Sequence, residues 1–369
     1  MNLLSSTSVY SFFTLISRIL GYLRDILIAI FLGASIFADA FFVAFRLPNT
    51  FRRLFAEGTF NAAFIPSYTS SKVESSKKGK KFADDILGTL LLILILIVTL
   101  AEIFTPYLVY IIAPGFIENN IKFNLAVELT RITFPFLLFV SLSSFFSGIL
   151  NSNNKFAAAA AAPIILNIIL IISLLISYYL NLNFVKQLSY GVTLAGVIQL
   201  IFLFLVSLKF YKPSLVLKLK KDNKVKFFFK KLIPSIFSSG VTQINILIGT
   251  IIASFETGAV SYLYYADRIY QINLAIAGIA VGTVSLPVLS RTFKEKNIKK
   301  LTNIQSKSFE LSLLLSIPAS FGLIIASEEI VNALFGYGSF SKEDVKLTAD
   351  ALKYFGYGVP AFALIKILS

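Results

Sequence analysis

Apolar segments long enough to cross a bilayer recur along almost the whole chain of 369 residues. A spanning α-helix needs about 20 mostly apolar residues. About ten stretches qualify, at 9–31, 37–68, 83–113, 125–150, 157–180, 188–208, 227–254, 259–289, 309–335 and 345–368. Charged residues make up only 14% of the chain, against about 25% in soluble domains. The sequence therefore predicts an all-α polytopic membrane protein with about ten transmembrane helices.

The residue types that are missing limit the chemistry. The chain has no cysteine and no histidine, which argues against disulfides, thiolate chemistry, histidine acid–base catalysis and the usual zinc or haem sites. It also lacks a G-x-S-x-G motif, a Walker A motif and an Asp-rich diphosphate–metal motif. We therefore expect neither an enzyme nor a metal site, with an intramembrane transferase that uses carboxylates as the open alternative.

The basic residues fall in alternate connections between the apolar segments. Connections rich in lysine follow the second, sixth and eighth segments, at 72–81, 209–231 and 291–300. The opposite connections hold only Lys122, Lys186 and Lys342. By the positive-inside rule the N-terminus is cytoplasmic. The net charge of +15 then reflects topology, and without a nucleic-acid-binding signature we expect no nucleic-acid partner.

A weak internal repeat suggests two lobes. The residue pairs 33–34 and 258–259, and the stretches 45–48 and 270–273, align at one constant offset that equals six predicted segments. An even number of segments gives both copies the same orientation, as in parallel transporter repeats. We expect an N-terminal six-helix lobe at 1–208, a basic cytoplasmic connection at 209–231 and a partial C-terminal lobe at 232–369. A second lobe of about four segments favours a truncated chain, with a complete ten-helix protein as the alternative.

The stretch 17–66 is apolar enough to enter a bilayer, yet it carries the arginines Arg18, Arg24, Arg46, Arg52 and Arg53. A charge at the bilayer centre costs roughly 2.5–3.5 kcal/mol on insertion scales. Such residues persist where they face a bundle interior, a water-filled cavity or a charged partner. Guanidinium groups bind oxyanions through paired donors and stay charged, so the stretch suggests an anionic ligand inside the membrane.

Structural alternatives exist for each of these charges. Arg18 and Arg24 are six residues apart, about 240° around a helix, so they point in different directions unless the helix bends. Asp25 could compensate Arg24 in a structural network. Arg53 could snorkel to the headgroups and pair with Glu57 four residues later.

The second segment contains its own interruption. Pro48 and the Arg52-Arg53 pair predict a broken or bent helix that ends near Pro66, and broken helices are common at transporter binding sites. Asp39 lies near the outer end of this segment. It fits either a helix cap or a site residue.

The eighth segment supplies a further arginine, in the sequence YYADR at 264–268. Asp267 points about 100° away from Arg268 on a helix and is poorly placed to cancel its charge. We therefore expect Arg268 to face Arg24 and Arg52 from the opposite lobe and to complete a cationic site. A structural ion pair with another helix is the alternative.

Four stretches resemble the MurJ (MviN) family of lipid II flippases, which belongs to the MOP exporter superfamily. They are SRILGYLRDILIA at 17–29, ADAFFVAFRLPNTFRRLFAEGTFNAAFIP at 38–66, VTQINILIGTIIAS at 241–254 and SYLYYADRIYQ at 261–271. The resemblance implies two six-helix lobes followed by two further helices. It also implies transport of the undecaprenyl-diphosphate-linked peptidoglycan precursor to the outer leaflet.

The resemblance assigns roles to individual residues. The family's central arginine triad falls on Arg24, Arg52 and Arg268, which are expected to hold the diphosphate. The remaining charged positions expected to support the site are Arg18, Asp25, Asp39, Arg53, Glu57 and Asp267. Gln271 stands where some members carry glutamate, as an accepted variant. Gly249 stands where the family usually has an aspartate of a proposed sodium site, so we expect no sodium cofactor and a transport cycle driven by the membrane potential.

These observations predict a flippase that works by alternating access in the bacterial cytoplasmic membrane. Its expected partners are lipid II, the bilayer and the cell-wall synthesis machinery. Two alternatives stay open: another exporter of the superfamily, for drugs or polysaccharide lipids, and a non-transporting membrane scaffold whose charges are all paired.

Overall fold

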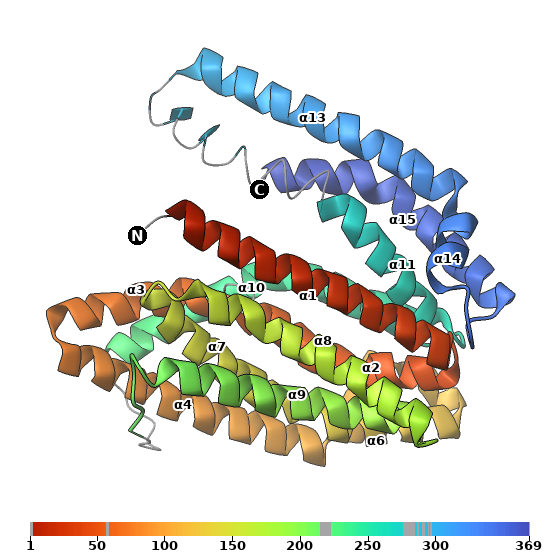
Figure 1. Ribbon diagram of the computed structural model, residues 1–369, viewed down its shortest axis with the longest axis horizontal. Coiled ribbons are helices and arrows are strands. Elements are labelled where there is room, and N and C mark those ends of the chain that lie inside the picture. Colours follow the sequence, from red (N-terminus) through yellow and green to blue (C-terminus); the bar gives the residue numbers. More distant parts are fainter. Residues whose placement is uncertain are drawn as a thin grey trace. The chain divides into compact units, whose positions relative to one another are not determined.

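The computed structural model describes residues 3–56, 59–214, 223–275 and 297–368, with residues 285, 288, 289, 292, 293 and 295 in addition. Every regular element in these ranges is a helix (Figure 1). Five helical stretches among them are long and apolar enough to cross a membrane, at 76–103, 120–152, 156–179, 184–207 and 298–325. Within the described residues each predicted segment coincides with a helix or a consecutive helix pair, while the eighth segment is described only to residue 275 and at single positions beyond it. The predicted all-α membrane fold is confirmed.

Two compact units make up the chain, and each is described by itself. The first contains residues 1–28 and 36–257, and the second contains residues 29–35 and 258–369. The helices of the first unit are α1 (Leu3–Leu32), α2 (Ile36–Ala56), α3 (Thr59–Glu74), α4 (Ser76–Ile103), α5 (Thr105–Ile112), α6 (Asn120–Thr133), α7 (Phe136–Ser152), α8 (Phe156–Tyr179), α9 (Phe184–Ser207) and α10 (Asn223–Ala253), with a short 3₁₀-helix at Pro114–Glu118. Within it, α9 packs against α7 and α8, and α2 packs against α6 and α7.

The second unit is built around α15 (Lys342–Leu368), which packs against α11 (Ala259–Leu274), α13 (Ile298–Ile325) and α14 (Ser327–Phe335). Figure 1 shows α13 and α15 side by side. Serines recur every fourth residue along α13 and are buried, at Ser308, Ser312, Ser316 and Ser320. Small side chains let membrane helices approach closely, which explains this contact.

Residues of the second unit cap the C-terminal end of α1. Ser339 donates its backbone N–H to the Ile30 carbonyl (2.8 Å) and its hydroxyl to the Phe31 carbonyl (3.3 Å). The Tyr265 hydroxyl donates to the Gly33 carbonyl (3.1 Å). The last carbonyls of a helix lack partners within it, and Gly33 ends α1 with φ at +61°, which glycine adopts without strain. The last turn of α1 thus belongs to the second unit together with the residues that cap it.

The second predicted segment contains α2 and α3, and residues 57–58 between them lie outside the described part of the chain. Helix α2 continues through Pro48 to Ala56, and α3 continues through Pro66 to Glu74, so the helix is not broken at Pro48 and the predicted end near Pro66 is wrong, while the predicted bend stays a prediction. Proline removes the amide that would bond the carbonyl four residues earlier. For Pro48 that carbonyl belongs to Ala44, and it accepts the buried Thr133 hydroxyl of α6 at 2.9 Å. A neighbouring helix therefore supplies the missing donor.

The same arrangement occurs in the second unit. Pro360 lies inside α15 and leaves the Gly356 carbonyl without its amide donor. The hydroxyl of Ser320 on α13 donates to that carbonyl at 2.7 Å. Because hydrocarbon offers no water, a carbonyl freed at membrane depth needs such a partner.

Aromatic packing places α10 in the first unit. Phe228 packs edge-on against Phe60 with ring centroids 5.5 Å apart, in a buried cluster that includes Phe64 and Phe145. Helix α10 therefore belongs to the first compact unit, although the sequence assigns 232–369 to the second lobe. The two compact units are defined by packing, whereas a transport lobe is defined by the helices that move together. The predicted lobe boundaries are therefore not tested by the units and stay a prediction.

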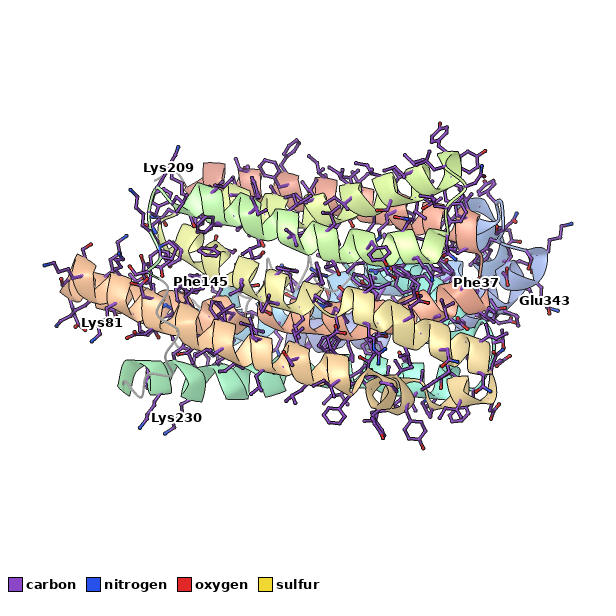
Figure 2. The ribbon with its side chains drawn as sticks, turned by 90° about the horizontal axis from the view of Figure 1, so that it is seen from below. Phe37, Lys81, Phe145, Lys209, Lys230 and Glu343 are labelled. Atoms are coloured by element: carbon purple, nitrogen blue, oxygen red, sulfur yellow. The ribbon has the colours of Figure 1, made fainter. Side chains whose placement is uncertain are left out.

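The lysine-rich connections of the first unit lie together. Figure 2 shows Lys81, Lys209 and Lys230 at one end of this unit and Phe37 at the other. Asp84 of α4 holds the start of the long connection, since it accepts the Tyr211 hydroxyl (2.6 Å) and the Ser214 N–H (2.9 Å). Burial, with this hydrogen bond, raises the pKa of Tyr211 above its usual value, so the phenol stays protonated and keeps donating.

Replacing Thr133 with valine tests the role of the hydroxyl beside Pro48. We expect Thr133→Val to destabilise the protein by about 1–3 kcal/mol, because the Ala44 carbonyl then has no donor. Thr130→Val is the matched control, since Thr130 donates to Ala126 within its own helix. Thermal unfolding in detergent should show a larger loss for Thr133→Val. Adding Pro48→Ala, which restores an amide, should recover part of it; equal losses for both valine variants would contradict this explanation.

Candidate substrate-binding site

Arg24 is buried in α1 with two acceptors beside it. Its Nε and Nη2 donate to Asp25 Oδ1 at 2.9 and 2.6 Å, and its Nη1 donates to Asn167 Oδ1 at 2.9 Å. The exposed fractions of Arg24 and Asp25 are 6% and 2%. Buried charges are stable where they are paired and hydrogen-bonded. The structural alternative for Asp25, compensation of Arg24, is therefore observed.

Asn167 of α8 is a site residue that the sequence analysis missed. Its Nδ2 donates to the Ser17 carbonyl at 2.8 Å, so its amide bridges two positions of α1. Gly21 lies between them, and a methyl group there would come within 3.5 Å of the amide nitrogen. The available signal was one asparagine in the apolar run ILNIIL, because polar side chains in membrane helices usually bond across helices.

Arg18 lies apart from this contact. Its side chain is exposed while that of Arg24 is buried, as the six-residue spacing predicts for one helix. Arg18 and Arg24 therefore do not share one face of α1. A role of Arg18 in supporting the site stays a prediction.

Arg52 is half-buried on α2 and donates from Nε to Asn49 Oδ1 at 2.9 Å. Asn49 lies one helical turn before it and carries no charge, so this contact orients the guanidinium without neutralising it. Glu57 and the side chain of Arg53 lie outside the described part of the chain. Their predicted pairing stays a prediction.

Asp39 forms a buried ion pair with Lys122. The Lys122 Nζ lies 2.6 Å from Asp39 Oδ2, with the two side chains 3% and 0% exposed. The same ammonium lies 4.1 Å from the centre of the Phe116 ring, a cation–π contact. The pair joins α2 to α6, so the structure favours a structural role for Asp39, and Lys122 is not a solvated loop residue.

Arg268 is half-buried on α11 and rests on a tyrosine. Its Nη2 donates to the Tyr264 hydroxyl at 2.8 Å, and its guanidinium carbon lies 4.6 Å from the centre of the same ring. The Asp267 carboxylate accepts a hydrogen bond from the Gln271 amide one turn later. This hydrogen bond holds the Asp267 carboxylate beside the next turn of the same helix. Arg24 and Arg52 belong to the first unit and Arg268 to the second, so their convergence on one pocket stays a prediction.

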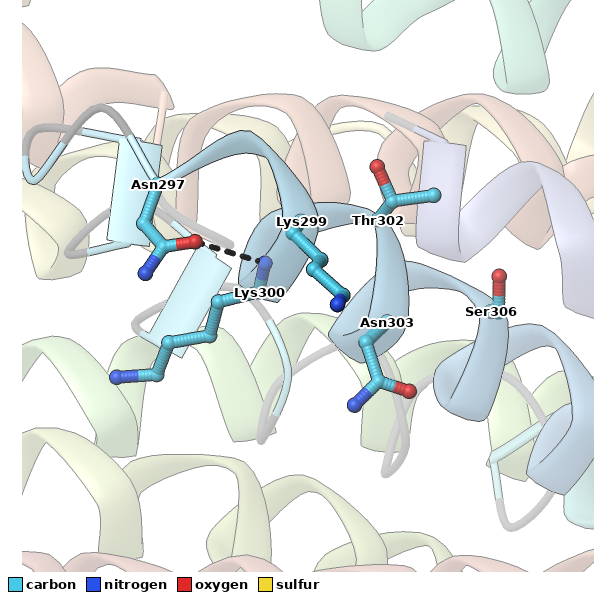
Figure 3. A pocket seen from close by; sticks show the side chains of 6 residues that line it. All are labelled: Asn297, Lys299, Lys300, Thr302, Asn303 and Ser306. Atoms are coloured by element: carbon cyan, nitrogen blue, oxygen red, sulfur yellow. Dashed lines mark hydrogen bonds between the residues drawn. The ribbon is translucent and has the colours of Figure 1, made fainter.

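An open hollow of 830 Å³ lies along the first turns of α13 (Figure 3). Its lining residues all have polar side chains and come from the N-cap and first turns of this helix: Asn297, Lys299, Lys300, Thr302, Asn303 and Ser306. Asn297 caps this helix by accepting the Lys300 N–H at 3.0 Å. None of the predicted site residues lines the hollow, so it is a surface feature separate from the candidate site.

Apolar helices that enclose hydrogen-bonded arginines are typical of multi-pass membrane transporters. Comparisons with known proteins support this class. A family model described as lipid II flippase MurJ matches residues 28–369. A probable lipid II flippase MurJ of Rickettsia prowazekii (strain Madrid E) is 40% identical over 370 residues, which cover 100% of this chain and 73% of the relative. A second, of Rhizobium tropici, is 42% identical over 361 residues, covering 96% and 68%.

Solved structures agree with these relatives. A structure titled "Lipid II flippase MurJ, inward closed conformation" superposes with a TM-score of 0.86 at 27% identity, covering 97% of this chain and 74% of that one. An inward-facing MATE-family transporter of the MOP superfamily gives a TM-score of 0.71 at 14% identity, which shows the shared fold alone. The chain belongs to the lipid II flippase MurJ family. Membership confirms the predicted resemblance and places the chain among transporters rather than enzymes, in the inner membrane.

Paired substitutions at Asp39 and Lys122 distinguish a structural role from a role in transport. Removing one partner of a buried ion pair leaves an uncompensated charge and costs about 3–5 kcal/mol, whereas replacing both with apolar groups is often neutral. We expect Asp39→Leu to lower the unfolding temperature strongly and the double variant Asp39→Leu with Lys122→Met to recover most of it.

Complementation of a flippase-depleted strain is the second measurement. If the pair is structural, the double variant grows. A stable double variant that fails to complement would assign Asp39 to transport.

Proposed function

We propose that this chain flips lipid II, the undecaprenyl-diphosphate-linked peptidoglycan precursor, from the inner to the outer leaflet of the bacterial cytoplasmic membrane by alternating access. Family membership and the names of the similar proteins support this function. The observation that carries it in this chain is Arg24, a charged donor buried in an apolar helix and bonded to groups on two helices. A diphosphate is the part of lipid II that matches such a donor.

The geometry at Arg24 indicates how an oxyanion would bind. A guanidinium carries five N–H donors and presents two-pronged edges. Asp25 engages the side edge formed by Nε and Nη2. The diphosphate would meet the two terminal nitrogens, of which Nη1 also donates to Asn167, so its binding would share or displace that contact. Arg52 and Arg268 donate to the uncharged acceptors Asn49 and Tyr264, and neither of these two contacts is an ion pair.

In the proposed cycle the positive charge of the three arginines acts at two steps, the binding of substrate and the return of the empty site. Binding of diphosphate offsets the repulsion among Arg24, Arg52 and Arg268, which lowers the barrier to moving the lobes so that the substrate reaches the outer leaflet. The inside-negative potential then favours return of the empty, positively charged site, with each charge that crosses the full field worth about 2.3 kcal/mol per 100 mV. The lysines at one end of the first unit (Figure 2) support a cytoplasmic N-terminus.

Two other functions make different demands on the same residues. An exporter of drugs or polysaccharide lipids is suggested by the fold shared with MATE transporters, and it would not depend on recognition of lipid II. A scaffold would need its charges only for stability.

We expect the enzymes that make and use lipid II in the cell wall to be the functional partners, with the bilayer as the route of lateral entry.

Alanine substitution of the three arginines tests the proposed function. We expect Arg52→Ala, Arg268→Ala and the double variant Arg24→Ala with Asp25→Asn, which leaves no buried carboxylate without its partner, each to abolish growth of a flippase-depleted strain and lipid II translocation in vesicles, while the membrane level of each variant stays normal. Arg131→Ala is the matched control, because Arg131 is exposed on α6 and lies outside the proposed site. Normal growth of all three variants would reject the mechanism.

The cation dependence of transport follows from residue 249. Gly249 supplies no ligand where the family is expected to have an aspartate, and a methyl group there would meet no atom within 4 Å. Among the described residues no group of three acidic side chains gathers as a metal site would require. We expect translocation rates to be unchanged when sodium is replaced by potassium at constant membrane potential. A rate that follows sodium concentration would contradict this.

A further inference from the structure

We propose that Asn167 is a positioning residue for substrate binding, a neutral amide that aims Arg24 at the diphosphate without adding a second negative charge. The inference rests on the proposed function, because it concerns the same arginine. It begins with the position of Asn167, which is 143 residues from Arg24 in sequence and on another helix. Asp25 lies beside Arg24 on the same helix, whereas Asn167 joins the guanidinium to a second helix.

The hydrogen bonds of Asn167 fix the orientation of its amide. Arg24 can only donate and the Ser17 carbonyl can only accept. The oxygen of Asn167 must therefore face Arg24 (2.9 Å) while its nitrogen faces Ser17 (2.8 Å). Asn167 is 6% exposed, so water does not compete freely for either bond. The amide is held at both ends, and it holds Arg24 in turn.

The neutrality of Asn167 matters because Asp25 already supplies one counter-charge. Arg24 and Asp25 together carry no net charge. Aspartate at position 167 would keep an oxygen facing Arg24, but it would make this group of three side chains net negative and place an oxygen against the Ser17 carbonyl. A negative group repels a diphosphate, whereas an amide does not.

The other two candidate arginines show the same choice of acceptor. Arg52 donates to the amide oxygen of Asn49, and Arg268 donates to the hydroxyl of Tyr264. At all three positions an uncharged oxygen accepts from the guanidinium. Asn167 is the one of these acceptors that acts from a different helix, which is why it makes the sharpest test.

The experiment measures binding of undecaprenyl diphosphate to the purified full chain in detergent, with inorganic diphosphate as competitor. We expect Asn167→Asp to weaken binding at least tenfold, or about 1.4 kcal/mol. The double variant Asp25→Asn with Asn167→Asp exchanges the two acceptors and restores the charge, so it should regain most of the affinity. Asn153→Asp is the matched control, since Asn153 accepts from Lys72 at 2.7 Å far along the chain from the site, and its binding should match the wild type.

The outcomes separate this inference from the proposed function. Wild-type binding by Asn167→Asp, together with lost binding by Arg24→Ala, overturns the role of Asn167 alone. Undiminished binding by Arg24→Ala overturns the proposed function at this site. A double variant as weak as Asn167→Asp also overturns the inference, because it assigns Asn167 only the structural bond to Ser17. Where Asn167→Asp does not fold, Asn167→Gln should retain binding and Asn167→Leu should lose it, and equal binding by these two variants overturns the proposal.

Discussion

The contact among Arg24, Asp25 and Asn167 is the constraint on which the first unit depends. A guanidinium in an apolar bundle is tolerated only where nearby acceptors replace the water it has lost. Here those acceptors come from α1 itself and from α8, so satisfying the charge also fixes two helices against each other. The same donors suit a diphosphate. Under the proposed function, stability without substrate and recognition of substrate rely on one group, and binding of the diphosphate would rearrange or share its contacts.

Backbone hydrogen bonding imposes the second constraint. Pro48 and Pro360 each free a carbonyl inside a helix, and hydroxyls of Thr133 and Ser320 on neighbouring helices bond those carbonyls. Interhelical side-chain hydrogen bonds contribute about 0.6 kcal/mol on average in membranes, but a buried carbonyl left with no donor costs about 1–3 kcal/mol. These two hydroxyls therefore hold their helices together mainly because their loss would leave a carbonyl unbonded. The same holds for Asp39 and Lys122, which join α2 to α6 and in which neither charge can be removed alone without a large cost.

The sequence predicts those features that depend on neighbours in the chain. Long apolar runs reveal the helices, and rare charges reveal Arg24 and its adjacent Asp25. Contacts between distant residues leave no such pattern. Thr133 lies 89 residues from the Ala44 carbonyl that it bonds, so the continuity of α2 through Pro48 was not predictable. Asn167 is a single polar residue in an apolar helix, and its partner can be identified only when α8 is placed beside α1.

Helices α1 and α11 each carry an arginine beside an aspartate, but the two pairs find different hydrogen-bond partners. In each helix an arginine stands next to an aspartate, as Arg24-Asp25 and as Asp267-Arg268. On α1 the two side chains bond to each other, whereas on α11 Gln271 bonds the aspartate and Tyr264 accepts from the arginine. A glutamate at position 271 would face Asp267 as a like charge and could not donate to it unless protonated. Glutamine thus keeps this turn of α11 electrically balanced.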